Sequence, residues 1–223
     1  LRKRPLNWGL SDMANQNAPR GLWPIQSASG APSNYEMVNK NIAYDAAAIW
    51  RGDPVLLLDT SYISKWVAGT ASRLLFGVFW GCSYLSTSQG KLISSPVWPG
   101  ADVASTAQES ITAQIIPCNI GATAPVFQVQ SDVTGVVFAD IGLNCEITMA
   151  AGNSLNGWSA AFASGIADTA TLPFNIIGLS GGPLGAGGTG VIRPSTTNPY
   201  GGSPTGAYAW MNVRPNLAGL QGI

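Results

Sequence analysis

The chain has 223 residues, enough for one large β domain or for one domain with long arms. Hydrophobic residues make up 46% of it and charged residues only 10%, against roughly 25% in ordinary soluble domains. The formal net charge is zero, which excludes the disordered class, because disordered chains combine low hydrophobicity with high net charge. A surface so poor in charge predicts that other chains cover much of it, and so favours a component of an assembly.

Residues 1–34 predict an extended N-terminal arm. The segment contains four prolines, which oppose regular structure. No apolar core follows its basic start, so a secretory signal is not expected. Three adjacent basic residues are a weak footprint for nucleic acid, since a nucleic-acid-binding domain usually has a basic face and a high pI, and the pI here is about 6.4. The charged residues of the arm are Arg2, Lys3, Arg4, Asp12 and Arg20.

Residues 35–180 carry the strand signals and predict a β domain. The clearest strand is 74–85, where large apolar residues alternate with glycine and serine. This is also the most apolar stretch, but its twelve residues are short of the roughly 20 that a membrane-spanning helix needs. Turn residues recur at intervals typical of a β-barrel or sandwich. Further strands are expected at 55–58, 62–67, 110–116, 125–129, 135–138 and 174–179, and short helices only at 45–50 and 160–167.

Residues 181–223 form a Gly/Pro-rich C-terminal segment in which we expect a final strand, because Tyr208, Trp210 and Asn212 alternate with smaller or apolar residues. Residues 185–190 (GAGGTG) formally match the dinucleotide-binding pattern GxGxxG. That pattern requires a following helix and an acidic residue about 20 positions later. Pro194 and Pro199 oppose the helix, and no acidic residue follows Asp168. We therefore interpret the segment as a loop.

The chain has no histidine, which removes Ser-His-Asp and Cys-His catalysis and histidine-bound zinc. The three cysteines are odd in number, far apart and without a CxxC pair, so we expect small buried residues rather than disulfides or zinc ligands. Among the carboxylates, Asp132 and Asp140 are a candidate pair for a glycosidase, although aspartate's preference for turns favours a structural role. We expect no enzyme, no metal and no cofactor.

Eight tryptophans are present. Packing in the core and at subunit contacts is the expected role, because aromatic side chains concentrate there. The alternative is stacking on sugars by exposed rings such as Trp98 or Trp158.

From residue 13 onward, an ordered set of short motifs resembles a family of tailed-bacteriophage capsid decoration, or cement, proteins. The resemblance covers roughly residues 13–180. Residues 1–12 precede the family's usual start, and 181–223 are longer and richer in glycine than its pattern. The motifs are 13–24 (MANQNAPRGLWP), 46–55 (AAAIWRGDPV), 75–84 (LFGVFWGCSY), 96–99 (PVWP), 139–144 (ADIGLN) and 174–179 (FNIIGL).

The resemblance implies an all-β fold, with a β-barrel, β-tulip or sandwich body, on the outer capsid surface of the virion. Such a protein is commonly a homotrimer that bridges major capsid protein subunits and needs no cofactor, membrane or specific nucleic acid. The alternative is a carbohydrate-binding module in a phage tail fibre or on the capsid. A depolymerising glycosidase is a further alternative, and a major capsid protein is disfavoured because no long spine helix is evident. Expected capsid or subunit contacts are Arg2, Arg4, Trp8, Arg20, Trp23, Tyr200 and Trp210.

Overall fold

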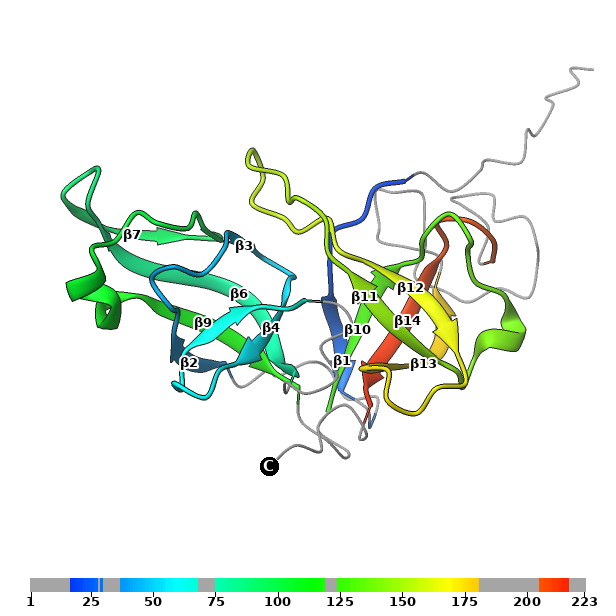
Figure 1. The fold of residues 1–223 in the computed structure, drawn as a ribbon. Coiled ribbons are helices and arrows are strands. Elements are labelled where there is room, and N and C mark those ends of the chain that lie inside the picture. The colour runs from blue at the N-terminus through cyan, green and yellow to red at the C-terminus, as the bar shows by residue number, and fades with distance from the viewer. Residues whose placement is uncertain are drawn as a thin grey trace, which may run out of the picture.

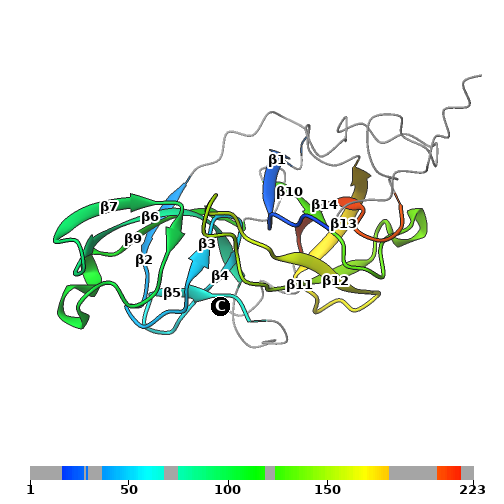
Figure 2. The same cartoon turned by 90° about the horizontal axis from the view of Figure 1, so that it is seen from above.

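The computed structural model describes residues 17–27, 29, 37–67, 75–118, 124–180 and 205–216. In these residues the fold is all-β, as expected, and the helices are two short 3-10 turns, η1 (Ser105–Ser110) and η2 (Phe138–Asp140). Two antiparallel sheets lie side by side, which makes the body longer than it is wide (Figures 1 and 2). We call the half built from residues 37–118 lobe 1, and the other half lobe 2.

The sheet of lobe 1 is built around the long strand β6, whose outer half also pairs with β7. Cys82 and Tyr84 are buried on one side of β6, as the predicted alternation requires. Phe79 was expected on the opposite side, but a bulge between Phe79 and Gly81 shifts the register and buries it in the same core. A two-stranded sheet, β3 (Ile49–Trp50) with β8 (Val97–Trp98), lies beside it. The order is β2 (Val38–Asn41), β9 (Thr112–Pro117), β6 (Leu75–Ser86), β4 (Pro54–Leu57) and β5 (Ile63–Lys65), with β7 at Lys91–Ser95.

The sheet of lobe 2 combines distant parts of the chain. The final strand, expected near residues 208–213, is β14, and it lies inside the sheet between β10 and β13. The strand order is β1 (Trp23–Ser27), β10 (Pro125–Gln130), β14 (Trp210–Pro215), β13 (Phe174–Ser180), β11 (Asn144–Thr148) and β12 (Phe162–Ala167).

Both sheets curl, but neither closes into a barrel. In lobe 1 a single bridge joins Ile42 to Ile63, and in lobe 2 a single bridge joins Ser131 to Ala163. The barrel alternative is therefore wrong, and a sandwich-like body fits. Two apolar cores fill the curled sheets, and β6 contributes to both, with Val78 in the core of lobe 2 and Phe79 in that of lobe 1.

Part of the expected arm belongs to the folded body. Leu22 is fully buried, and Trp23–Ser27 forms edge strand β1, paired with β10. Pro24 is tolerated because the strand lies at the edge of the sheet. The rest of the N-terminal arm up to residue 16, and residues 181–204 of the C-terminal segment, lie outside the described residues.

Three local predictions are wrong. The segments 45–50 and 160–167, expected as short helices, contain strands β3 and β12 instead. Alanine favours helix in isolation, but Ala161 and Ala163 are fully buried in the core of lobe 2, and tertiary packing overrides propensity. The strand expected at 135–138 is a single bridge at Val136 followed by η2, because Gly135 has a left-handed φ of 79° that interrupts an extended strand.

Candidate functional site

Four tryptophans and an arginine gather at the junction of the lobes. Trp23 of β1 stacks on Trp158, with ring centres 4.7 Å apart and planes 12° apart, and Trp80 of β6 lies 5.0 Å from Trp23. The Arg20 guanidinium lies 4.6 Å from the Trp23 ring centre, 5.5 Å from that of Trp158 and 5.4 Å from that of Trp210. We call these five residues the tryptophan–arginine cluster.

Arg20 holds the cluster together as a cation among aromatic faces. Its guanidinium donates to Gln128 Oε1 at 3.0 Å, while its Nε is buried without a hydrogen-bond partner. Burial lowers the pKa of Arg20 to about 10, so the side chain stays charged at neutral pH. Each cation–π contact of this kind stabilises by about 0.5–2 kcal/mol, more when water is excluded. The cluster therefore joins β1 and β14 to lobe 1.

The cluster brings together three of the seven expected contact residues. Arg20 and Trp23 are half-buried, but only 6% of Trp210 is exposed, which leaves little of its ring for a partner. Arg2, Arg4, Trp8 and Tyr200 lie outside the described residues.

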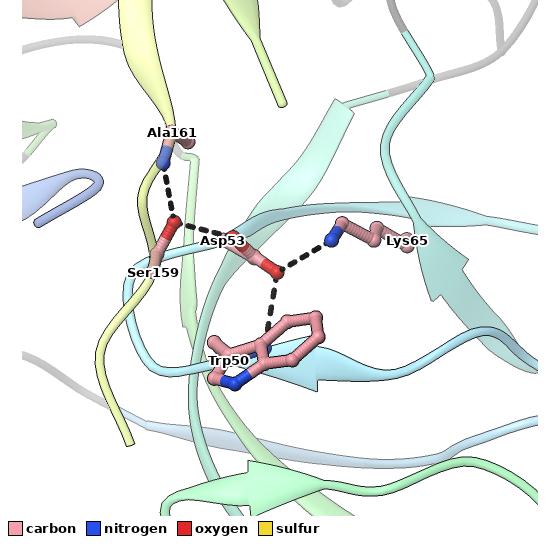
Figure 3. Close-up of polar contacts among 5 residues, drawn as sticks. All are labelled: Trp50, Asp53, Lys65, Ser159 and Ala161. Carbon is pink, nitrogen blue, oxygen red and sulfur yellow. Dashed lines mark hydrogen bonds and ion pairs between the residues drawn. The ribbon is translucent and has the colours of Figure 1, made fainter. Parts of the chain in front are cut away.

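Beside the cluster lies a buried polar network centred on Asp53 (Figure 3). The Asp53 carboxylate accepts hydrogen bonds from the Ser159 hydroxyl at 2.5 Å and from the Trp50 backbone N–H at 3.0 Å. It also forms an ion pair with Lys65 Nζ at 3.3 Å. Ser159 Oγ in turn accepts the Ala161 N–H. Burial raises the pKa of Asp53, and the positive charge of Lys65 and the hydrogen bonds oppose that rise.

The network fastens one lobe to the other. Asp53 precedes β4 in lobe 1, whereas Ser159 and Ala161 precede β12 in lobe 2 (Figure 3). Backbone hydrogen bonds reinforce this junction, from Leu22 N–H to the Gly52 carbonyl and from Ser159 N–H to that of Arg51. Asp53 is fully buried and Ser159 is 2% exposed, so a substrate cannot reach this serine. We interpret the network as structural.

The carboxylates considered for a glycosidase each cap a turn. Asp132 Oδ1 accepts the N–H groups of Thr134 and Gly135, and Asp140 Oδ2 accepts the N–H of Val137. Both residues line a hollow of about 390 Å³ near β12. Their hydrogen bonds confirm the expected turn role, which follows from the ability of a short carboxylate side chain to accept nearby backbone N–H groups.

Large apolar side chains are exposed at three separate tips of the body. At the β6–β7 hairpin, the cross-strand partners Leu85 and Leu92 are 47% and 71% exposed. Leu155, in the connection from β11 to β12, is 95% exposed. The third tip is the loop from β10 to β11, which contains η2 and where Val133, Val137, Phe138 and Ile141 are between 41% and 68% exposed. This loop and the β6–β7 hairpin lie at opposite ends of the molecule (Figures 1 and 2).

No protein-family model, curated protein or solved structure matches this chain. The roles of its residues are therefore assigned from chemistry and geometry. Within the described part of the chain, no helix is long and apolar enough to cross a membrane. The same residues contain no group of three or more cysteine, aspartate or glutamate side chains arranged to hold a metal ion.

The tryptophans considered for sugar binding do not form an open platform. Trp98 is fully buried and donates its indole N–H to the Ala46 carbonyl. One face of Trp158 is covered by Trp23, and Arg20 approaches the same ring. These positions fit the expected packing role and count against stacking on a sugar by either ring.

The cysteines are buried and free, as expected. Burial raises the pKa of the Cys82 thiol to about 12, and raises the pKa of Cys118 and Cys145 further. Because the thiolate is the nucleophile and the metal ligand, all three behave as small apolar side chains.

Proposed function

We propose that this chain is a virion structural protein that binds the outer surface of a tailed-bacteriophage capsid and bridges major capsid subunits. In this role it acts as a homotrimer, without catalysis and without a cofactor. The observation that carries the proposal is the exposure of apolar side chains at well-separated tips of one body. Contacts at opposite ends suit a protein that links two neighbours.

Several features of the chain support this role. Each exposed leucine or phenylalanine that becomes buried against a partner contributes about 1.5–3 kcal/mol. Attachment at several tips raises the avidity well beyond that of one contact. A ligand that binds only the assembled shell stabilises that shell by mass action. Because the chain carries few charges, covering the rest of its surface with partner subunits removes few charged groups from water, and the desolvation cost stays small.

The apolar tips provide the first test. We expect Leu92→Ser and Phe138→Ser each to weaken binding to empty capsid shells by about tenfold, since each removes one buried apolar contact. The measurement is cosedimentation of purified chain with shells assembled from the major capsid protein of the same phage.

Val67→Ser is the matched control, because Val67 is 59% exposed but lies at none of the three tips. Unchanged binding of both tip variants would refute attachment through these tips. Cryo-electron microscopy of the intact virion then places the chain. Density in threes between subunits on the outer shell supports the proposal, and density confined to the tail contradicts it.

The N-terminal arm provides a second test. A chain that begins at Asn17 lacks Arg2, Arg4 and Trp8 but keeps the buried Leu22 and strand β1. We expect this truncation to weaken shell binding while its unfolding temperature stays unchanged. A truncation through residue 24 would not separate these effects, because it also removes Leu22 from the core. Full shell binding by the chain that begins at Asn17 would contradict a role of the arm.

A further inference from the structure

A polar hollow of about 360 Å³ lies on the outward face of the lobe 1 sheet. Two cross-strand rows of side chains form it. In the first row, Ser83 of β6 stands between Ser94 of β7 and Thr112 of β9. In the second, Gln114 of β9 stands between Gly81 of β6 and Asn39 of β2.

The missing side chain at Gly81 creates the floor of this hollow. A Cβ there would meet only the Ser95 carbonyl oxygen, at 3.2 Å. Larger residues at this position would fill the space between the two rows.

The polar groups around the hollow have unused hydrogen-bonding capacity. Within the described part of the chain, the side chains of Asn39, Ser83, Ser94, Thr112 and Gln114 make no hydrogen bond. By contrast, the Asn175 side chain is hydrogen-bonded to Leu143 and Asn144, and that of Thr148 to Ser164. Hydroxyl and amide groups gathered around one hollow can donate to and accept from a ligand rich in hydroxyls.

Arg51 lines the same hollow, and among the described residues around it Arg51 alone is charged. Its Nε donates to the Trp80 carbonyl at 2.8 Å, and its guanidinium lies 5.3 Å from the Trp80 ring centre. Both contacts fix the direction of the side chain. The terminal nitrogens make no hydrogen bond or ion pair with any described residue. A guanidinium held in this way is suited to a planar carboxylate, which it binds through two parallel hydrogen bonds.

We propose that this hollow binds an acidic saccharide of the uronic acid class. The carboxylate pairs with Arg51, and the ring hydroxyls bond to the serine, threonine and amide side chains of the two rows. The volume lies near the lower end of small-ligand sites, about 300–1,000 Å³, and suits a mono- or disaccharide. The site uses none of the three apolar tips, so it does not depend on capsid attachment.

Chemical-shift titration of the ¹⁵N-labelled full chain tests this proposal. Three probes, each measured at the same sodium concentration, separate the contribution of the carboxylate from that of the hydroxyls. Glucuronate carries both groups, acetate only the carboxylate and glucose only the hydroxyls. We expect saturable shifts at the amides of Gly81, Ser83 and Gln114, with glucuronate binding at least about tenfold more tightly than acetate or glucose. Equal binding of acetate and glucuronate, or shifts scattered over the surface, would overturn the proposal.

Variants localise the site. Ser83→Leu fills the hollow and is expected to abolish the shifts, whereas Ser88→Leu, on the exposed β6–β7 turn, leaves them unchanged. Arg51→Gln is expected to weaken glucuronate binding at least about tenfold. Arg51→Lys is expected to weaken it less, because lysine keeps the positive charge but cannot make two parallel hydrogen bonds to the carboxylate. Wild-type affinity in Ser83→Leu would refute the site, even if Arg51→Gln failed to fold.

Discussion

Replacing Asp53 with alanine is expected to lower the free energy of unfolding by about 3–5 kcal/mol, the usual cost of breaking a buried ion pair from one side. The substitution leaves the Ser159 hydroxyl and the Trp50 N–H without their acceptor, and removes the partner of Lys65. Ser159 is almost fully buried, so water cannot readily replace the lost bond. Urea-induced unfolding followed by tryptophan fluorescence measures the loss.

Asp59→Ala is the matched control, because Asp59 is exposed in the turn after β4. We expect it to change the stability by no more than about 0.5 kcal/mol. Asp53→Asn keeps the shape of the side chain but not the charge, and should fall between the two. A loss below about 1 kcal/mol in Asp53→Ala would show that desolvation of the carboxylate nearly cancels its bonds, and a gain in stability would show that it outweighs them.

Gly21→Ala is expected to destabilise the chain by about 2–5 kcal/mol, from crowding and a left-handed backbone together. Gly21 has a φ of 73°, and a Cβ there would lie 2.5 Å from the Gly52 oxygen and 2.6 Å from Ser159 Cβ. The first neighbour is backbone and the second is held in the Asp53 network, so neither yields easily. Thermal and urea unfolding measure the effect.

Gly90→Ala separates these two causes. Gly90 also has a left-handed φ, 63°, but a Cβ there would have no neighbour within 4 Å. We expect it to cost only about 1–2 kcal/mol, the backbone contribution alone. Equal losses of stability in the two variants would mean that crowding of the Gly21 Cβ against Gly52 and Ser159 costs nothing beyond the backbone strain.

The fold class and the strongest strands could be predicted from the sequence, because their signals are local. The alternation along β6 and that along β14 each identify a strand directly. Strands β2 and β7 were missed, since their residues are largely polar and exposed or only partly buried. β11 was missed because its two fully buried residues, Cys145 and Ile147, give too short an alternation to stand out in the sequence. β1 was missed because Pro24 opposes a strand anywhere but at a sheet edge.

The candidate site was less predictable, because its parts come together only through the fold. Asp53 in Gly52-Asp53-Pro54 has the form of an ordinary turn, and nothing nearby in sequence indicates Ser159 as its partner, 106 positions away. Arg20, Trp23 and Trp210 were expected at a contact from composition alone, and their mutual packing depends on β1 and β14 flanking β10. The hollow at Gly81 depends on strand register, which periodicity does not give.

The position of β14 between β10 and β13 has a consequence for how the chain matures during synthesis. The strands of lobe 1 span Val38 to Pro117 without interruption from the other lobe, so they can pair while the rest is still being made. Lobe 2 cannot do the same, because its interior strand β14 comes last along the chain among the described strands. Until Pro215 leaves the ribosome, β10 and β13 each lack a neighbour, and unpaired strand edges are open to pairing with another chain. We therefore expect prompt completion of translation to protect this protein from aggregating in the cell that makes it.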